Sequence, residues 1–278
     1  MCALLVCVVT LAAPAKAADA IGSPVGLETG FHQMYNLDFD GAHNTFQVWE
    51  ASHPDDALGP ASNAAAYLFA EFARLHILES ELFTDDHRFA KREKQVPDPQ
   101  ARAAFDRELA RSDQISGRIL SGSPQDRNAL LAQVLANGLR GDYAAMIEKR
   151  NLAGLSYMKA GRALAEKLLA VDPSCYDAYL AVGVENYLLG NNAAPVRWLL
   201  RLGGAETDKQ EGIAKLRLTA EKGHYLAPYA RLLLAVAALR DHDRETARHL
   251  LTGLADEFPQ NALYRNELAR LQPQENQR

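Results

Sequence analysis

Four prolines in this chain each end the same short pattern, and this pattern is the strongest constraint on its fold. The residue twelve positions before each proline is small and the residue five positions before is large and apolar: Ala42 and Trp49 before Pro54, Ser112 and Ile119 before Pro124, Gly161 and Leu168 before Pro173, and Ala247 and Leu254 before Pro259. A small residue lets two helices approach closely, and a large apolar one fills the groove beside it. Because proline cannot continue a helix, each pattern also ends one helix before another begins. The sequence therefore predicts one kind of helix contact at four places.

Helical periodicity continues through the chain from about residue 30 onward. Leu164, Leu168 and Leu169 form one apolar stripe, for example, while Glu166 and Lys167 fall on the polar side. The alternation typical of strands is almost absent. With 48% hydrophobic and 23% charged residues, the chain has enough apolar surface to bury a core. We therefore expect an all-α protein.

The proline pattern resembles the tetratricopeptide repeat, a helix pair of 34 residues with a terminal proline. The residues that carry the resemblance are Gly30, Ala42, Phe46 and Pro54 near the start, Tyr179, Val182 and Gly183 after Pro173, and Ala247, Leu251, Leu254 and Pro259 near the end. The resemblance implies antiparallel helix hairpins stacked into an α-solenoid over residues 27–271. Because the four prolines are 70, 49 and 86 residues apart, insertions must separate degenerate repeats. A general likeness to uncharacterised exported bacterial proteins of this type implies no activity.

The same signals divide residues 21–278 into about five helix pairs and a closing helix, which together form one expected domain. The expected pairs are residues 27–36 with 39–53, 59–82 with 99–121, 125–140 with 152–172, 176–190 with 208–223, and 225–240 with 243–258, and the closing helix is 261–271. A final helix with a polar outer side is what such an array needs to stay soluble.

Residues 1–20 have the features of a cleaved secretory signal peptide. An apolar run over residues 3–13 is followed by small residues at alternating positions, and it is too short to span a bilayer. We therefore expect an exported protein, periplasmic or secreted, with a buried N-terminal helix or strand as the alternative. Lipoprotein anchoring at Cys7 is not expected, because Val6 stands where a small residue is needed. Cleavage would leave Cys175 as the one cysteine, and we expect a partly buried structural thiol there.

Charge and motif spacing argue against several functions. The net charge of −5 provides no basic surface for nucleic acid. Five histidines between His32 and His87 lack the spacing of helical metal ligands, so no metal or cofactor is expected. The sequence contains no GxSxG motif, no plausible Cys/His arrangement and no phosphate-binding loop. We therefore assign no catalytic residue and expect a protein that is not an enzyme.

The inner helices of a tetratricopeptide array line a concave binding face, and the resemblance assigns this lining to particular residues. They are Asp177, Leu180, Val184, Tyr187 and Leu188 in the fourth pair, Tyr229, Leu232, Val236, Leu239 and Arg240 in the fifth, and Asn128, Leu131, Leu135 and Leu139 in the third. An apolar lining with a few tyrosines suits an amphipathic helix or an extended peptide. The leading hypothesis is therefore a non-catalytic interaction module or scaffold that binds a segment of a partner protein.

Other functions remain open at this point. A closed superhelix can carry a lipid or another apolar small molecule, the scattered histidines or carboxylates can belong to an enzyme, and the insertions can fill the groove. A large closed apolar cavity would favour the carrier and an open groove the scaffold. Three converging His or carboxylate side chains would favour the enzyme.

Two smaller features also carry expectations. Residues 193–204 interleave arginines with apolar side chains, so this segment either touches a membrane surface through Val196, Trp198, Leu199 and Leu202 or packs over the array. Asn137 and Asn186 each stand thirteen residues after a pattern proline, inside apolar helices. A buried amide needs partners, and we expect these two to bond to the insertion loops.

Overall fold

The computed structural model describes residues 25–78, 93–190 and 208–271, and all regular secondary structure within them is helical. In chain order the α-helices are α1 (Val25–Tyr35), α2 (Phe39–Ser52), α3 (Leu58–Arg74), α6 (Pro99–Gly122), α7 (Arg127–Asp142), α8 (Asn151–Val171), α9 (Tyr179–Gly190), α11 (Lys209–Lys222), α12 (Ala227–Arg240), α13 (Arg244–Glu257) and α14 (Ala262–Arg270). A π-helical turn, η1 (Tyr143–Ile147), and a 3₁₀ turn, η2 (Tyr176–Ala178), complete the described elements. The all-α prediction is confirmed.

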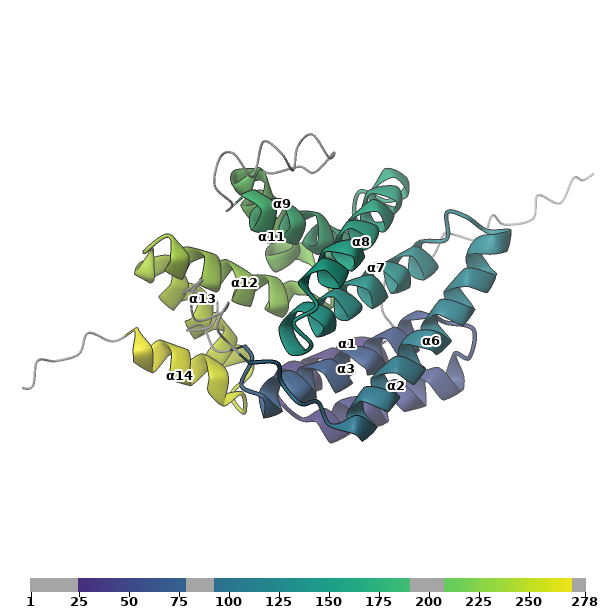
Figure 1. The fold of residues 1–278 in the computed structure, drawn as a ribbon, viewed down its shortest axis with the longest axis horizontal. Coiled ribbons are helices and arrows are strands. Elements are labelled where there is room, and N and C mark those ends of the chain that lie inside the picture. Colours follow the sequence, from purple (N-terminus) through teal and green to yellow (C-terminus); the bar gives the residue numbers. More distant parts are fainter. Residues whose placement is uncertain (1–24, 79–92, 191–207, 272–278) are drawn as a thin grey trace, which may run out of the picture.

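Contacts between successive helices dominate the packing. Each described α-helix packs against the next one along the chain, and α3 also packs against α7. In Figure 1, α1, α2 and α3 lie at the bottom, α6 at the right, α9 and α11 at the top, and α12, α13 and α14 at the left. The helices thus follow one another around the molecule in sequence order.

The four proline patterns form the same turn. The residue before each proline donates its backbone N–H to the carbonyl four residues earlier, at 2.8 to 2.9 Å. The residue two positions after the proline then donates back across the turn, at 3.0 to 3.2 Å. The small residue of each pattern is buried, and the Ser112 hydroxyl even donates to the Ala57 carbonyl at 2.9 Å. The pattern therefore predicts the same helix-ending turn at four places, and in each of these helices the small residue is buried.

Two glycines show how closely the helices approach one another. A Cβ on Gly30 of α1 would lie 2.4 Å from the ring of Phe46 in α2. A Cβ on Gly212 of α11 would lie 2.5 Å from the backbone nitrogen of Tyr187 and 2.9 Å from the carbonyl oxygen of Gly183, both in α9. Backbone atoms cannot rotate aside as a side chain can, so the packing of α9 on α11 requires glycine at position 212.

The last helices return to the first one. The Tyr35 hydroxyl of α1 donates to the Tyr225 carbonyl at 3.1 Å, and the Asn261 side-chain amide donates to the Tyr35 carbonyl at 2.8 Å. Ring centroids lie 4.9 Å apart for Phe31 and Tyr225, and 5.7 Å apart for Tyr35 and Phe258. All five residues are buried. We refer to Phe31, Tyr35, Tyr225, Phe258 and Asn261 as the closing contact.

The described helices begin and end within a few residues of the predicted ranges, with one exception. The helix expected over residues 59–82 ends at Arg74. His76 has a positive φ of 52°, which an α-helix cannot contain, and the Ile77 N–H bonds back to the Phe72 carbonyl at 3.0 Å. This turn is a typical way to satisfy the last carbonyls of a helix.

The predicted loop partner is wrong for Asn137, which is half-buried, and stays a prediction for Asn186. The Asn137 side chain donates to the Gln133 carbonyl of its own helix at 2.9 Å. Asn186 in α9 accepts from Arg162 of α8 at 3.0 Å. Arg162 is long enough to cross between the two helices while its aliphatic stem stays buried, so a neighbouring helix supplies this partner of Asn186.

Cys175 stands in the turn after α8, where it is buried. Burial raises the pKa of its thiol to about 12, and the nearby carboxylate of Asp177 adds to the rise. Because the thiolate is the reactive form of cysteine, burial and the raised pKa both disfavour reaction of this residue in the folded protein. Its environment agrees with the structural role expected from the sequence.

We predict that Gly212→Ala will lower the free energy of unfolding by about 1–3 kcal/mol, because the new methyl group forces α9 and α11 apart. Gly253→Ala is the matched control, since a Cβ there meets no described atom within 4 Å. Alanine favours a helix interior, so the control should gain up to about 1 kcal/mol. Urea unfolding followed by circular dichroism measures both changes. Equal stability of the two variants would show that the approach is not tight.

Replacing Asn261 tests the closing contact. Its side-chain oxygen also caps α14 by accepting from the Leu263 N–H at 3.0 Å. Asn261→Ser keeps a capping oxygen but cannot reach the Tyr35 carbonyl, so we expect a loss of about 1–2 kcal/mol in urea unfolding. Asn261→Ala loses the cap as well and should cost about 1 kcal/mol more. A serine variant as stable as the wild type would contradict the assignment.

Candidate functional site

A cavity of about 390 Å³ lies between α1, α3, α7, α8, α9 and α12. Most of its wall is apolar, with Leu135, Met158, Val184 and Leu233 among the side chains that contribute. Many of these side chains are only half-buried although they lie inside the molecule, because the cavity leaves part of their surface uncovered. The lining also includes Asn151, an exposed residue at the start of α8, so the cavity reaches the surface there.

One polar pair joins opposite walls of this cavity. Asp142 is the last residue of α7, and Tyr229 lies in the first turn of α12. The Tyr229 hydroxyl donates to Oδ2 of Asp142 at 3.3 Å. Behind this pair, the ring of Phe69 from α3 meets the ring of Tyr229 edge-on, with centroids 5.4 Å apart. Elements from three separate parts of the chain therefore form this end of the cavity, which we call the Asp142 end.

The apolar surroundings change the chemistry of Asp142. Burial raises the pKa of its carboxyl group from an ordinary value near 3.8 to about 7, and the hydrogen bond from Tyr229 offsets only part of the rise. Burial, together with the nearby Asp142, also raises the pKa of Tyr229 well above its usual value. Tyr229 therefore keeps its proton and remains the donor. A carboxyl group with a pKa of about 7 is partly uncharged near neutral pH.

Asp177 lines the cavity, but its carboxylate already accepts hydrogen bonds from the protein backbone. Its two oxygens accept from the backbone N–H groups of His224, Tyr225 and Leu226, at 2.9 to 3.1 Å. The side chain is buried. Burial raises the pKa of its carboxyl group, and the three hydrogen bonds from the N–H groups lower it by a smaller amount. Asp177 therefore holds the segment before α12 in place beside the start of α9.

The opposite end of the cavity lies where α9 and α12 end. Tyr187 of α9 and Arg240 of α12 both belong to the lining. Tyr187 is buried, and its hydroxyl has no hydrogen-bond partner among the described residues. Lys209 of α11 places its ammonium group 5.9 Å from the Tyr187 ring centroid and pairs with Asp241, the residue after Arg240. We call this region the Tyr187 end.

The structure brings most of the predicted groove residues together around the cavity. Those in the lining are Asp177, Leu180, Val184, Tyr187, Tyr229, Val236 and Arg240, together with Leu135 and Leu139 of the third pair. Leu232 is buried away from the cavity and Leu233 lines it instead, because one residue turns about 100° around a helix. The side chain of Leu188 lies outside what the structure describes. Binding of a partner by these residues stays a prediction.

Sequence reasoning missed the lining residues on α8 and the polar group at the end of α7. Leu155 and Met158 come from a helix that the repeat pattern assigned to the outer layer. Asp142 follows Leu135 by seven residues, which places both on one helix face. Because Leu135 was already expected to face the groove, that spacing could have predicted that Asp142 faces it as well.

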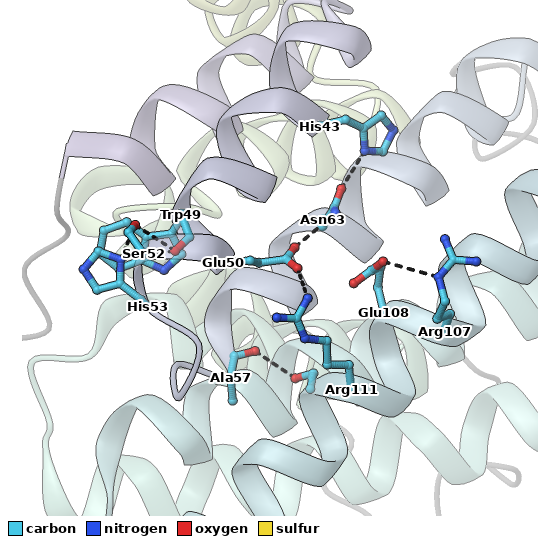
Figure 2. A network of polar contacts seen from close by, with 11 residues as sticks. His43, Trp49, Glu50, Ser52, His53, Ala57, Asn63, Arg107, Glu108 and Arg111 are labelled. Carbon is cyan, nitrogen blue, oxygen red and sulfur yellow. Dashed lines mark hydrogen bonds and ion pairs between the residues drawn. The ribbon is translucent and has the colours of Figure 1, made fainter.

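Figure 2 shows a second group of polar side chains, on α2, α3 and α6, around the buried Asn63. The Asn63 amide donates to Glu50 at 3.1 Å, and its oxygen lies 2.6 Å from Nδ1 of His43. An amide oxygen can only accept, so His43 carries its proton on Nδ1. Arg111 pairs with the other oxygen of Glu50. Glu108 lies on the same side with one oxygen 3.7 Å from Nε of Arg107.

This network ties three helices together, and we interpret it as structural. Burial raises the pKa of Glu50, and the like charge of Glu108 adds to the rise. One histidine and two carboxylates converge here. Both oxygens of Glu50, however, already accept hydrogen bonds, one from Asn63 and one from Arg111. His43 is held by Asn63. Within the described ranges, no group of three or more His, Cys, Asp or Glu side chains could hold a metal ion.

Comparison of the chain with protein-family models, with curated proteins and with solved structures finds no match. The resemblance to tetratricopeptide repeats therefore stays a prediction from the sequence. A helical fold by itself hosts many functions, so the chemistry and shape of the site carry the information about function.

No helix in the described part of the chain is long and apolar enough to cross a membrane. The predicted membrane-contact residues Val196, Trp198, Leu199 and Leu202 lie outside the described residues, as does the predicted signal peptide over residues 1–20. Export and membrane contact both stay predictions.

Asp142→Asn should change how stability depends on pH. Because the folded-state pKa is raised, the folded protein binds more protons than the unfolded chain between about pH 4 and about pH 7, so wild-type stability falls as pH rises through that window. Asp142→Asn removes this pH dependence, so the variant should be more stable than the wild type by about 4 kcal/mol above pH 7. Urea unfolding across the window measures the difference.

Asp106→Asn provides the control for this change, because Asp106 is an exposed carboxylate on α6. We expect its effect to stay below about 1 kcal/mol at every pH. A wild-type stability that does not vary with pH, or that varies equally in both variants, would show that Asp142 is not desolvated.

Proposed function

We propose that the protein binds an apolar small molecule in the cavity and acts as its carrier. The observation that supports this is a largely apolar cavity of about 390 Å³ with polar groups at its two ends. Ligand sites in proteins typically measure roughly 300–1,000 Å³ and combine apolar walls with a few polar groups that orient the ligand. The cavity has both properties.

The proposal includes an architecture for the carrier. In it, helix hairpins of the tetratricopeptide type stack as an α-solenoid whose inner face turns toward the cavity. The four identical proline turns support repeated hairpins. The closing contact supports a ring, because Tyr35 of α1 bonds to Tyr225 and Asn261 near the other end of the chain. A solenoid closed in this way encloses its concave face instead of offering it as an open groove.

The scaffold expected from the sequence is the second candidate. Leu180, Val184 and Leu233 are half-buried lining residues, and the exposed Asn151 lies at the edge, so an apolar side chain of a partner helix can also enter. This hypothesis predicts that Tyr187→Ala and Tyr229→Ala lose a protein partner in cross-linking from the envelope fraction. The carrier hypothesis predicts that they lose a small molecule.

A non-catalytic role and export complete the proposal. The carboxylates near the cavity and in the Asn63 network are mostly occupied by hydrogen bonds and ion pairs, which suits a structural role better than proton transfer. Export is supported by the sequence of residues 1–20. The carrier would then work in the periplasm or outside the cell.

Filling the cavity should block binding. Val184→Phe adds bulk to the lining, so we expect it to weaken binding of the neutral apolar dye N-phenyl-naphthylamine by about tenfold or more. Val48→Phe is the matched control, because Val48 is exposed on α2 and should leave dye affinity unchanged. Fluorescence titration measures the dissociation constants. Absence of dye binding to the wild type, or equal loss in both variants, would contradict the carrier proposal.

A further inference from the structure

Asp142 has one carboxylate oxygen that is unpartnered and open to the cavity. Its Oδ2 accepts from Tyr229, whereas Oδ1 has no hydrogen-bond partner among the described residues. Unlike the unpartnered oxygen of Glu108, Oδ1 is also not sealed inside the protein. Protein atoms surround Asp142 closely enough for burial to dominate its pKa, yet part of the residue stays uncovered because it borders the cavity. A ligand in the cavity can therefore reach Oδ1.

No cation of the described residues compensates the charge of Asp142. The pKa of its carboxyl group responds to burial and to Tyr229, and one long hydrogen bond of 3.3 Å does not replace the lost water. Among the described lining residues, Arg240 alone is basic. It follows Tyr229 by eleven residues in α12, about 16 Å along the helix axis at 1.5 Å per residue, and it already interacts with another group. The Asp142 carboxylate is therefore an uncompensated charge in an apolar wall.

Aromatic rings continue the wall beside Asp142. The Tyr229 ring meets the Phe69 ring edge-on, with centroids 5.4 Å apart, and the Phe69 ring meets the Tyr35 ring in the same way at 5.5 Å. The Phe31 ring follows at 6.4 Å from Tyr35. All four rings line the cavity. Because the face of an aromatic ring attracts a cation, these rings and the carboxylate favour positive charge at the Asp142 end.

A carboxylate at this position costs the folded protein stability. Since burial raises its pKa to about 7, the ionised group is less favourable in the fold than in the unfolded chain. Leu139 and Met146, three and four residues away from Asp142, line the same cavity with apolar side chains. A titratable group that is perturbed by burial and faces a cavity is typical of a binding site.

We infer that the cavity binds an amine with an apolar body, whose ammonium group pairs with Oδ1 of Asp142 beside the Tyr229 ring. The ammonium donates a hydrogen bond to this oxygen and supplies the positive charge that the described residues do not. The apolar body covers half-buried side chains of the wall, among them Leu135, Leu180 and Leu233. This inference rests on the proposed carrier function and adds the chemical class of the ligand.

The test compares three probes that share one alkyl chain and differ in the head group: decylamine, decanol and decanoate. At pH 8 the Asp142 carboxyl is largely ionised and an alkylamine is protonated. Displacement of N-phenyl-naphthylamine measures the affinity of each probe. We expect the wild type to bind decylamine about tenfold to a hundredfold more tightly than decanol, because hydrogen bonds to charged groups are the strong ones.

Asp142→Asn should lose this preference, so that the ratio of decylamine to decanol affinity falls to about one. Asparagine keeps an oxygen that accepts from Tyr229 but carries no charge. Asp106→Asn is the matched control, because it removes the same charge from the exposed side of α6, outside the lining. The control should keep the wild-type ratio. The same ratio in Asp142→Asn as in the control would overturn the assignment of the ammonium to Asp142.

The outcomes separate this inference from the proposed function. If the dye does not bind and calorimetry detects no binding of any probe, the carrier function fails and the inference falls with it. If decylamine and decanol bind the wild type with equal affinity, the carrier function stands and the amine inference is overturned. If decanoate binds most tightly, the carrier function also stands, but the cavity prefers the charge opposite to the one inferred.

Discussion

The closing contact is the interaction on which the cavity depends. Successive helices pack on one another along the whole described chain, but that packing alone does not bring the two ends together. Tyr35 does so, because its hydroxyl and its carbonyl both bond to residues near the C-terminal end, Tyr225 and Asn261. With those bonds in place, Phe69 of α3 and Tyr229 of α12 meet as parts of one wall. These bonds therefore connect α1 with the segments that precede α12 and α14.

The helices could be predicted from the sequence because the signals for them are local. The distance from a small residue to a proline is read within one helix, and so is a stripe of leucines. The groove positions on α9 and α12 were also largely predictable, since the repeat pattern states which face of an inner helix turns inward. Leu232 shows the limit of this reasoning: an error of one residue rotates a side chain from the cavity into the core.

The chemistry of the cavity could not be predicted, because it arises from contacts between distant residues. Asp142 and Tyr229 are 87 residues apart, and no pattern in the sequence indicates that they form a pair. Asp177 was expected to face a ligand, yet its carboxylate accepts hydrogen bonds from three backbone N–H groups near residue 225. Only the surroundings of Tyr187 show that its hydroxyl meets no hydrogen-bond partner among the described residues.

The long sequence separation of the closing contact has a consequence for how the chain folds. The donor to the Tyr35 carbonyl comes 226 residues later, so the side of α1 that meets Tyr225 and Phe258 stays uncovered until almost all of the chain has been synthesised. Local hairpins form early, whereas contacts between distant residues bear the entropy cost of closing a long loop and form late. During that interval the sides of the Phe31 and Tyr35 rings that later meet Tyr225 and Phe258 stay exposed, which favours association with other chains. A chaperone that shields the first hairpin would therefore act at the stage where this protein is most vulnerable.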